Sequence, residues 1–269
     1  GQALAEWTGR HEVGVTLEGH GREELLPGVD LTRTVGWFTT QFPVVLPVGD
    51  EWGRTLKSVK EALRALPHRG VSFGALDIGR PGGGPLPQVS FNYHGRFDVA
   101  DGGFYRARRD AVGEDVPPDA PRTHLIEVTG LVERGELELS WQYSEHVHDE
   151  DTVRRLAERT LEALREIVAH CARPGVGGRT PSDFPLARLT QEQVDALAGP
   201  DVEDVLPLTP LQAGLVFHSL VEPGTYVDRM RLVLDGVRDP EALRQAWQRV
   251  VGPTPRLRAP GRGGRRPQP

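Results

Sequence analysis

The spacing of apolar residues along the chain predicts an alternation of strands and helices. Between residues 11 and 18 every second position is apolar, which is the period of a half-buried strand. From residue 51 to residue 66 the apolar positions recur at steps of three and four, which predicts an amphipathic helix. A second helix is expected over residues 150–171, with a buried stripe formed by Val153, Leu156, Thr160, Leu164 and Ile167.

Four further strands are expected. Residues 32–47 are aromatic and β-branched but contain prolines, which predicts a strand joined to a buried, irregular loop. Residues 86–98 predict a short strand, and residues 99–121 have the composition of a loop. A hairpin then turns at Arg134-Gly135, and the side chains expected to face inward from its second strand are Leu137, Leu139, Trp141 and Tyr143. This order predicts a mixed α/β layer, a sheet with flanking helices.

Composition divides the 269 residues into four stretches. Residues 1–172 hold the α/β unit, and residues 173–200, rich in proline, glycine and arginine, are expected to be a linker or an extended segment on a surface. A second, incomplete unit is expected over residues 201–252. Residues 253–269 contain five arginines and five prolines, so they cannot form a core. We expect a disordered basic tail there, either genuine or produced by a change of reading frame.

The expected second unit contains two helices and a strand. Thr209 is placed to cap the first helix, with Gln212 in the capping-box position. Residues 230–236 predict a strand. Asp239 is expected to open the second helix, whose apolar face is formed by Leu243, Ala246, Trp247 and Val250.

Charge and composition narrow the class of protein. The net charge of −6 argues against a nucleic-acid or anionic-membrane partner, because such surfaces normally carry a basic excess. The single cysteine, Cys171, cannot form an internal disulfide, which favours a reducing compartment, and we expect the cytoplasm. The chain begins at Gly1 and its only methionine is Met230, which suggests a piece of a longer protein.

The stretch LEGHGREEL, residues 17–25, places charged groups at a spacing of two. On a continued strand Glu18, His20 and Arg22 would share one face, about 7 Å apart. Neighbouring positive charge favours the ionised carboxylate, which could then accept a proton. Gly19 and Gly21 leave room for another backbone or a ligand. From spacing alone, a glycine-rich strand end with solvated charges is the stronger alternative.

Four stretches together resemble a known family. They are LEGHGREEL (17–25), RTVGWFTTQFPVVLP (33–47), PHRGVSFGAL (67–76) and VSFNYHGRFD (89–98), in the order and approximate spacing of the motifs of epimerization domains in nonribosomal peptide synthetases. The resemblance implies the C-terminal lobe of a two-lobed fold similar to chloramphenicol acetyltransferase. Residues 202–252 resemble the opening of a condensation domain from the next module.

The resemblance also implies a substrate and a set of site residues. The substrate would be an aminoacyl or peptidyl thioester on the phosphopantetheine arm of a partner carrier domain, with no cofactor bound directly. Glu18 would be a catalytic proton acceptor, and the substrate-binding candidates are His20, Arg22, Asn92 and Tyr93. A second proton-handling group is expected from a His-His-x-x-x-Asp-Gly motif in the N-terminal lobe. No two adjacent histidines occur in this sequence, so we expect no turnover from this chain alone.

Two alternatives to epimerization stay open. The first unit could be part of a condensation domain that forms amide bonds, although such domains as a rule lack the glutamate-bearing stretch. It could also be a non-catalytic module that docks a carrier domain. The cluster EHVHDED, residues 145–151, is expected to be the solvated first turn of a helix and not a metal site.

Overall fold

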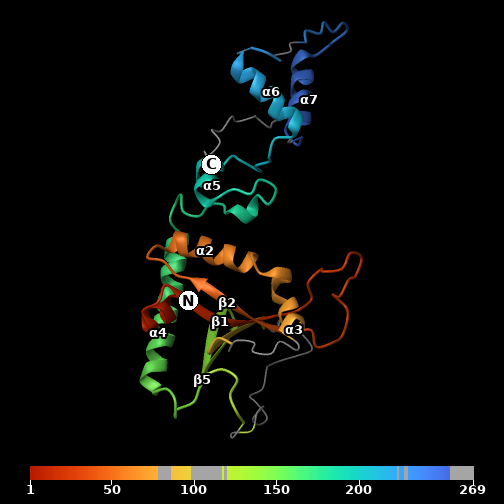
Figure 1. The fold of residues 1–269 in the computed structure, drawn as a ribbon. Coiled ribbons are helices and arrows are strands. Elements are labelled where there is room, and N and C mark those ends of the chain that lie inside the picture. Colours follow the sequence, from red (N-terminus) through yellow and green to blue (C-terminus); the bar gives the residue numbers. More distant parts are fainter. Residues whose placement is uncertain (78–85, 98–116, 118–119, 223, 227–229, 255–269) are drawn as a thin grey trace. The chain divides into compact units, whose positions relative to one another are not determined.

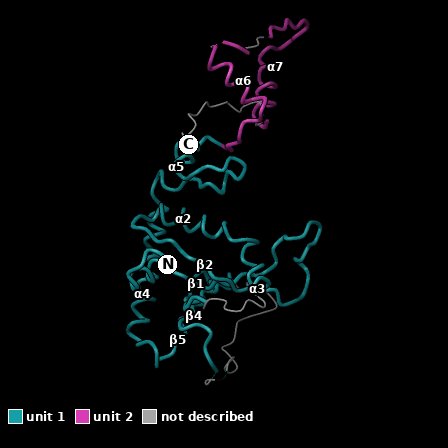
Figure 2. The backbone as a smooth tube through the Cα atoms, viewed as in Figure 1, with its two compact units in different colours: residues 1–202 teal, residues 203–269 magenta. Residues whose placement is uncertain are grey.

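The computed structural model describes residues 1–77, 86–97, 117, 120–222, 224–226 and 230–254. Most of the expected loop at 99–121 and nearly all of the expected tail at 253–269 therefore lie outside the described residues. The chain forms two compact units, residues 1–202 and residues 203–269 (Figure 2).

The first unit is built on a mixed five-stranded sheet (Figure 1). Its strands are β1 (Glu12–Gly19), β2 (Thr40–Pro47), β3 (Val89–Arg96), β4 (Ile126–Glu133) and β5 (Glu136–Tyr143), in the spatial order β2-β1-β3-β4-β5. The two outer pairs, β1 with β2 and β4 with β5, are antiparallel, and β3 is parallel to both of its neighbours. The predicted mixed α/β layer is confirmed.

The residues of the hairpin turn and the prolines of β2 suit the positions in which the structure places them. Arg134 and Gly135 both have positive φ, 53° and 77°, as a tight turn between twisted strands requires. On β5 the alternation holds for three of the predicted inward positions, but Leu137 is exposed because it lies at the turn end of the hairpin. Pro43 and Pro47 lie in β2, which is an edge strand and so tolerates residues that cannot donate a hydrogen bond.

Three helices cover the sheet. They are α1 (Gln2–Thr8), α2 (Trp52–Arg64) and α4 (Glu150–Cys171), and α2 and α4 confirm the predicted spans. Figure 1 shows α1 lying beside α4, and the two helices also contact one another. One buried cluster consists of Ala3, Ile126, Val128 and Leu156, and a second of Ala5, Val13 and Val48.

The buried stripe of α4 differs from the prediction at four positions. Val153 and Leu156 are buried as expected, and the third buried residue is Ala163. Ala163 lies two turns after Leu156 on the same face of the helix. The other predicted members are only half-buried: Thr160 and Ile167 on the same face, and Leu164 at its edge.

Several short helices had no periodic signal in the sequence. A 3-10 turn (Pro67–Gly70) leads into α3 (Ser72–Asp77). Between residues 173 and 200, where a linker or surface segment was expected, the chain forms the 3-10 turn η2 (Pro181–Asp183) and α5 (Gln191–Leu197). This segment packs inward: its most buried side chains, Thr180, Phe184 and Val194, are each 1% exposed.

The second unit contains α6 (Pro210–Val221) and α7 (Pro240–Val251). The Thr209 hydroxyl accepts from the amide of Gln212, and Asp239 accepts from two amides at the start of α7, as predicted. The prediction of a strand at 230–236 is wrong: all of these residues are described, and they form no strand. A strand needs a hydrogen-bonded neighbour, and none of the described residues pairs with this stretch.

Candidate functional site

Glu18 lies near the carboxyl end of β1, on the more polar face of the sheet. It pairs across the strands with Gln41 of β2, whose side-chain Nε2 donates to Glu18 Oε2 at 3.2 Å. Leu17 and its alternate neighbours Val13 and Val15 point to the opposite, apolar face. Glu18 is half-buried, so its carboxylate is held by a neighbour while remaining accessible.

The structure separates Asn92 from Tyr93. The parallel register pairs Thr16 with Ser90 and Leu17 with Phe91. Because side chains alternate along both strands, Glu18 and Asn92, the next residue on each strand, belong to the same face of the sheet. The Asn92 amide Nδ2 lies 3.0 Å from His94 Nε2, two residues farther along that face. Tyr93 points to the opposite face and is about half exposed. The two predicted substrate-binding residues of β3 therefore cannot act on the same side of the sheet.

The expected alignment of Glu18 with His20 and Arg22 on one strand face is wrong. β1 ends at Gly19, and Gly21 has a φ of 64°, which turns the chain away from the strand. The His20 ring is exposed; its Nδ1 accepts from the amide of Arg22 at 3.0 Å, and its Nε2 lies 3.4 Å from Glu23 Oε1.

Arg22 points into the following loop. Its guanidinium donates to the carbonyl oxygens of Leu31, Thr34 and Gly36 at 2.7, 2.7 and 3.3 Å. Its Cζ lies 4.4 Å from the centre of the Phe38 ring. Three backbone carbonyls and one aromatic face thus occupy the guanidinium, which had been expected to contact substrate.

The four sequence motifs converge around the end of β1. Glu23 of the first motif pairs with Arg69 of the third, with Oε2 and Nη1 3.0 Å apart. Gly70, beside Arg69, packs so closely on the Phe42 ring of the second motif that an added Cβ would lie 2.2 Å from it. The fourth motif contributes β3, the parallel neighbour of β1. Segments that are far apart in the sequence therefore lie together around the end of β1, the strand that carries Glu18.

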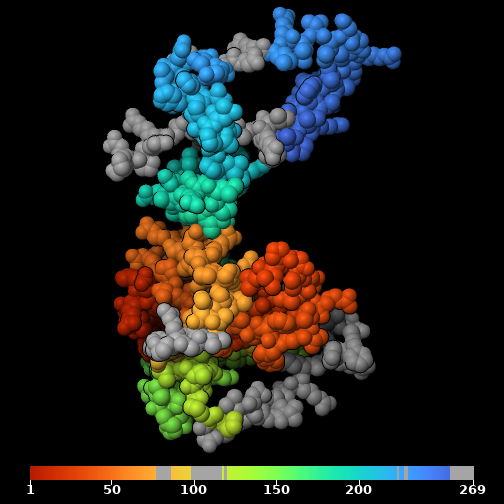
Figure 3. Space-filling model, turned by 45° about the vertical axis from the view of Figure 1, so that its right-hand side comes forward, coloured from red at the N-terminus to blue at the C-terminus, as the bar shows by residue number. Residues whose placement is uncertain are grey.

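Two features of this region were missed by sequence reasoning. Gln41 had no assigned role, although its position opposite Glu18 follows once the two strands are paired in register. The loop that precedes β2 was expected to be buried, yet Val35 and Trp37 are 100% and 96% exposed. Figures 1 and 3 show this segment, in red-orange, projecting from the sheet.

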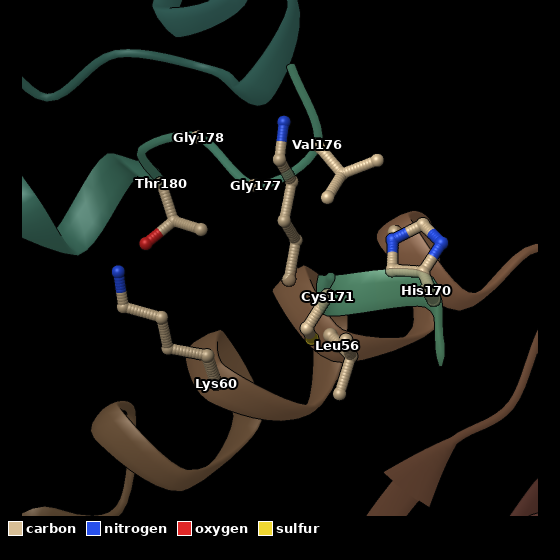
Figure 4. Close-up of a pocket in the computed structure, with 10 residues that line it drawn as sticks. Leu56, Lys60, His170, Cys171, Val176, Gly177, Gly178 and Thr180 are labelled. Carbon is tan, nitrogen blue, oxygen red and sulfur yellow. The ribbon is translucent and has the colours of Figure 1, made fainter. Parts of the chain in front are cut away.

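A separate hollow of about 200 Å³ lies over α2 and the end of α4 (Figure 4). It is lined by Leu56, Lys57, Lys60, His170, Cys171 and residues 176–178 and 180, together with Gly53. Both lysines already form ion pairs, with Asp195 and Asp183 respectively. None of the predicted site residues borders this hollow.

The described part of the chain contains neither a metal-binding cluster nor a membrane-spanning helix. Within it, no group of three or more histidine, cysteine, aspartate or glutamate side chains is arranged to bind a metal ion. Two of the four acids of EHVHDED, Glu150 and Asp151, occupy the first turn of α4, and Asp149 is the residue before it. Among the same residues, no helix combines the length and the apolar character needed to cross a membrane.

Comparison with known proteins identifies several relatives. Residues 1–189 match the family described as Condensation domain. A linear gramicidin synthase of Brevibacillus parabrevis is 45% identical over 266 residues, which is 93% of this chain and 3% of that protein. Bacitracin synthase 3 of Bacillus licheniformis is 32% identical over 265 residues, 93% of this chain and 4% of that protein. The chain thus spans a small part of these much longer synthases.

One solved structure is similar in both fold and sequence. The crystal structure of the epimerization domain from the third module of tyrocidine synthetase B superposes with a TM-score of 0.56 at 34% sequence identity. The match covers 64% of this chain and 40% of that chain.

Proposed function

Because the chain belongs to the condensation-domain family, we propose that it is part of a nonribosomal peptide synthetase whose domain epimerizes a carrier-bound aminoacyl or peptidyl thioester. The observation that carries this proposal is the half-buried Glu18 carboxylate, held by Gln41 beside Asn92 on one face of the sheet. The similarity to an epimerization domain supports this reaction over amide-bond formation.

The proposed reaction is the removal and return of the α-proton. The thioester carbonyl acidifies the α-carbon, so Glu18 can take the proton as the C–H electron pair moves into an enolate. Gln41 holds the Glu18 carboxylate in place. In this proposal the Asn92 amide, which comes from the same face of the sheet, donates a hydrogen bond to the developing enolate oxygen. The carboxylate acts as general base and keeps the abstracted proton while a second group protonates the opposite face; release of the Glu18 proton to water then restores the carboxylate.

Inversion of the centre needs a proton donor on the opposite face of the planar enolate. The resemblance implies that a paired-histidine motif supplies this donor, and these 269 residues contain no two adjacent histidines. We therefore propose that the second group comes from another part of the synthetase. The phosphopantetheine arm and its carrier domain are partners in the same proposal, and residues 202–252 belong to a neighbouring condensation domain.

Isotope exchange tests the role of Glu18. The synthetase that contains this chain is loaded with aminoacyl thioester in D₂O, and deuterium at the α-carbon is followed by mass spectrometry. Glu18→Gln keeps the shape of the side chain but removes the base, so exchange should fall by about 10²-fold or more. Glu24→Gln, an exposed glutamate in the same motif, is the matched control and should leave exchange unchanged.

The same reaction mixtures separate the alternatives. Full exchange in the Glu18→Gln synthetase would remove Glu18 from the mechanism. Amide-bond formation that depends on Glu18, without α-deuteration, would support the condensing alternative. Binding of the loaded carrier domain with neither reaction would support a docking module.

A further inference from the structure

Arg22 holds the loop that precedes β2 in place. Its guanidinium donates to three carbonyl oxygens spread over residues 31–36 and lies against the Phe38 ring. The guanidinium presents five N–H donors in a rigid plane, so it can reach carbonyls that lie apart, whereas the three donors of an ammonium all radiate from one nitrogen. We propose that Arg22 is a positioning residue for Glu18, acting through this loop and Gln41, and not a substrate-binding residue. The proposal rests on the proposed function of Glu18.

Close packing beside Arg22 fixes the end of the loop. Gly21 presses against the backbone of Phe38 so tightly that a Cβ on Gly21 would lie 1.6 Å from the Phe38 carbonyl oxygen. The Arg22 side chain therefore holds the loop by hydrogen bonds, and Gly21 has no side chain that would keep the loop backbone away. We call this arrangement the clamp. The anchored part of the loop ends at Phe38, two residues before Thr40, the first residue of β2.

The clamp reaches Glu18 through one further residue. Gln41 is the second residue of β2, three positions after Phe38, and it donates the hydrogen bond to Glu18. Displacement of the loop end would shift Gln41 relative to β1 and leave the Glu18 carboxylate free to rotate. A general base that samples more orientations should lower the rate of proton transfer, with little effect on substrate binding.

Amide hydrogen exchange on this chain tests the clamp without any assay of activity. In Arg22→Lys, exchange over residues 31–41 should accelerate about tenfold or more, because charge-assisted hydrogen bonds to the carbonyls are lost. Exchange in β4 and β5 should stay unchanged. Arg33→Ala removes an exposed arginine of the same loop and is the matched control. Unchanged protection of residues 31–41 in Arg22→Lys would overturn the proposal.

Kinetics of α-deuteration in the synthetase that contains this chain test the positioning role. Arg22→Lys should lower kcat about tenfold and leave KM for the loaded carrier domain unchanged. Gln41→Ala should lower kcat by a similar factor without altering loop exchange, and the double variant should be no worse than the more affected single variant. A raised KM with unchanged kcat would instead assign Arg22 to substrate binding and overturn the proposal.

The control variant Glu18→Gln separates the two claims. If it abolishes deuteration while Arg22→Lys frees the loop without changing kcat, the positioning role is refuted and the role of Glu18 stands. If Glu18→Gln is fully active, the proposed function fails, and with it the positioning role, even where hydrogen exchange confirms the clamp.

Discussion

Replacement of Asp183 by asparagine should loosen the segment that follows α4. The Asp183 carboxylate accepts from Lys60 Nζ at 2.5 Å, from Arg64 Nη1 at 2.8 Å and from the amide of Thr180 at 2.9 Å. Asp183→Asn keeps the size and one acceptor oxygen but removes the negative charge. The segment would then be held to α2 mainly by its buried apolar side chains.

The loss of stability expected for Asp183→Asn depends on how exposed Asp183 and its two cationic partners are. A hydrogen bond to a charged group contributes about 1.5–3 kcal/mol when well shielded, and an exposed ion pair about 0.2–1 kcal/mol. The side chains of Asp183, Lys60 and Arg64 are 25%, 32% and 50% exposed, so both contacts are partly screened. We expect Asp183→Asn to lower the free energy of unfolding of residues 1–202 by about 2 kcal/mol. Asp201→Asn, an exposed aspartate, should have little effect.

The effect should also depend on pH. Partial burial of Asp183 raises its pKa, but hydrogen bonds from Lys60, the Thr180 amide and Arg64 outweigh burial and hold the pKa well below its ordinary value of 3.8. The folded state therefore favours the ionised carboxylate, and this stabilisation is fully present above about pH 4. It is lost as the pH falls toward the lower pKa of the folded state.

Urea denaturation of this chain, followed by tryptophan fluorescence at several pH values, measures the difference. The two proteins should differ by about 2 kcal/mol at pH 7 and should converge below pH 4. Equal stability at pH 7, or a difference that persists undiminished at pH 3, would refute the reasoning.

Two further substitutions test the packing of the first unit. Phe184→Ala should lower the free energy of unfolding by about 3–5 kcal/mol in the same urea assay, because Phe184 is 1% exposed, and the exposed Leu186→Ala should be nearly neutral. Arg159→Ala should lower the free energy of unfolding by about 1 kcal/mol, because the Arg159 guanidinium donates two hydrogen bonds to Glu6 in α1. The control is Arg165→Ala, on the exposed face of α4. A destabilisation by Arg165→Ala equal to that by Arg159→Ala would contradict the second prediction.

The elements that the sequence predicted well are those with local causes. The helices over 52–64 and 150–171 follow from apolar spacing, and the hairpin follows from Arg134-Gly135 between two alternating strands. Caps at Thr209 and Asp239 were equally visible because a capping side chain bonds to amides only a few residues away.

The errors arose where distant segments decide the outcome. Residues 230–236 have the alternation of a strand but no pairing partner among the described residues. Phe184 lies in a proline-rich stretch typical of a linker, yet its burial depends on packing within the first unit. The spacing of apolar residues and the composition are properties of one segment. Neither indicates which other segment of the folded chain packs against it.

For the candidate site, the sequence by itself determined the family resemblance, the placement of Glu18 on a strand and the room that Gly21 leaves for another backbone. Only the tertiary structure decided that the strand ends at Gly19, that Arg22 turns into the loop, and that Gln41 holds Glu18. The physical reason is that backbone geometry and periodicity are local properties of the chain. The partner of a guanidinium or a carboxylate, by contrast, is fixed by strand register and by the loop that folds back against it.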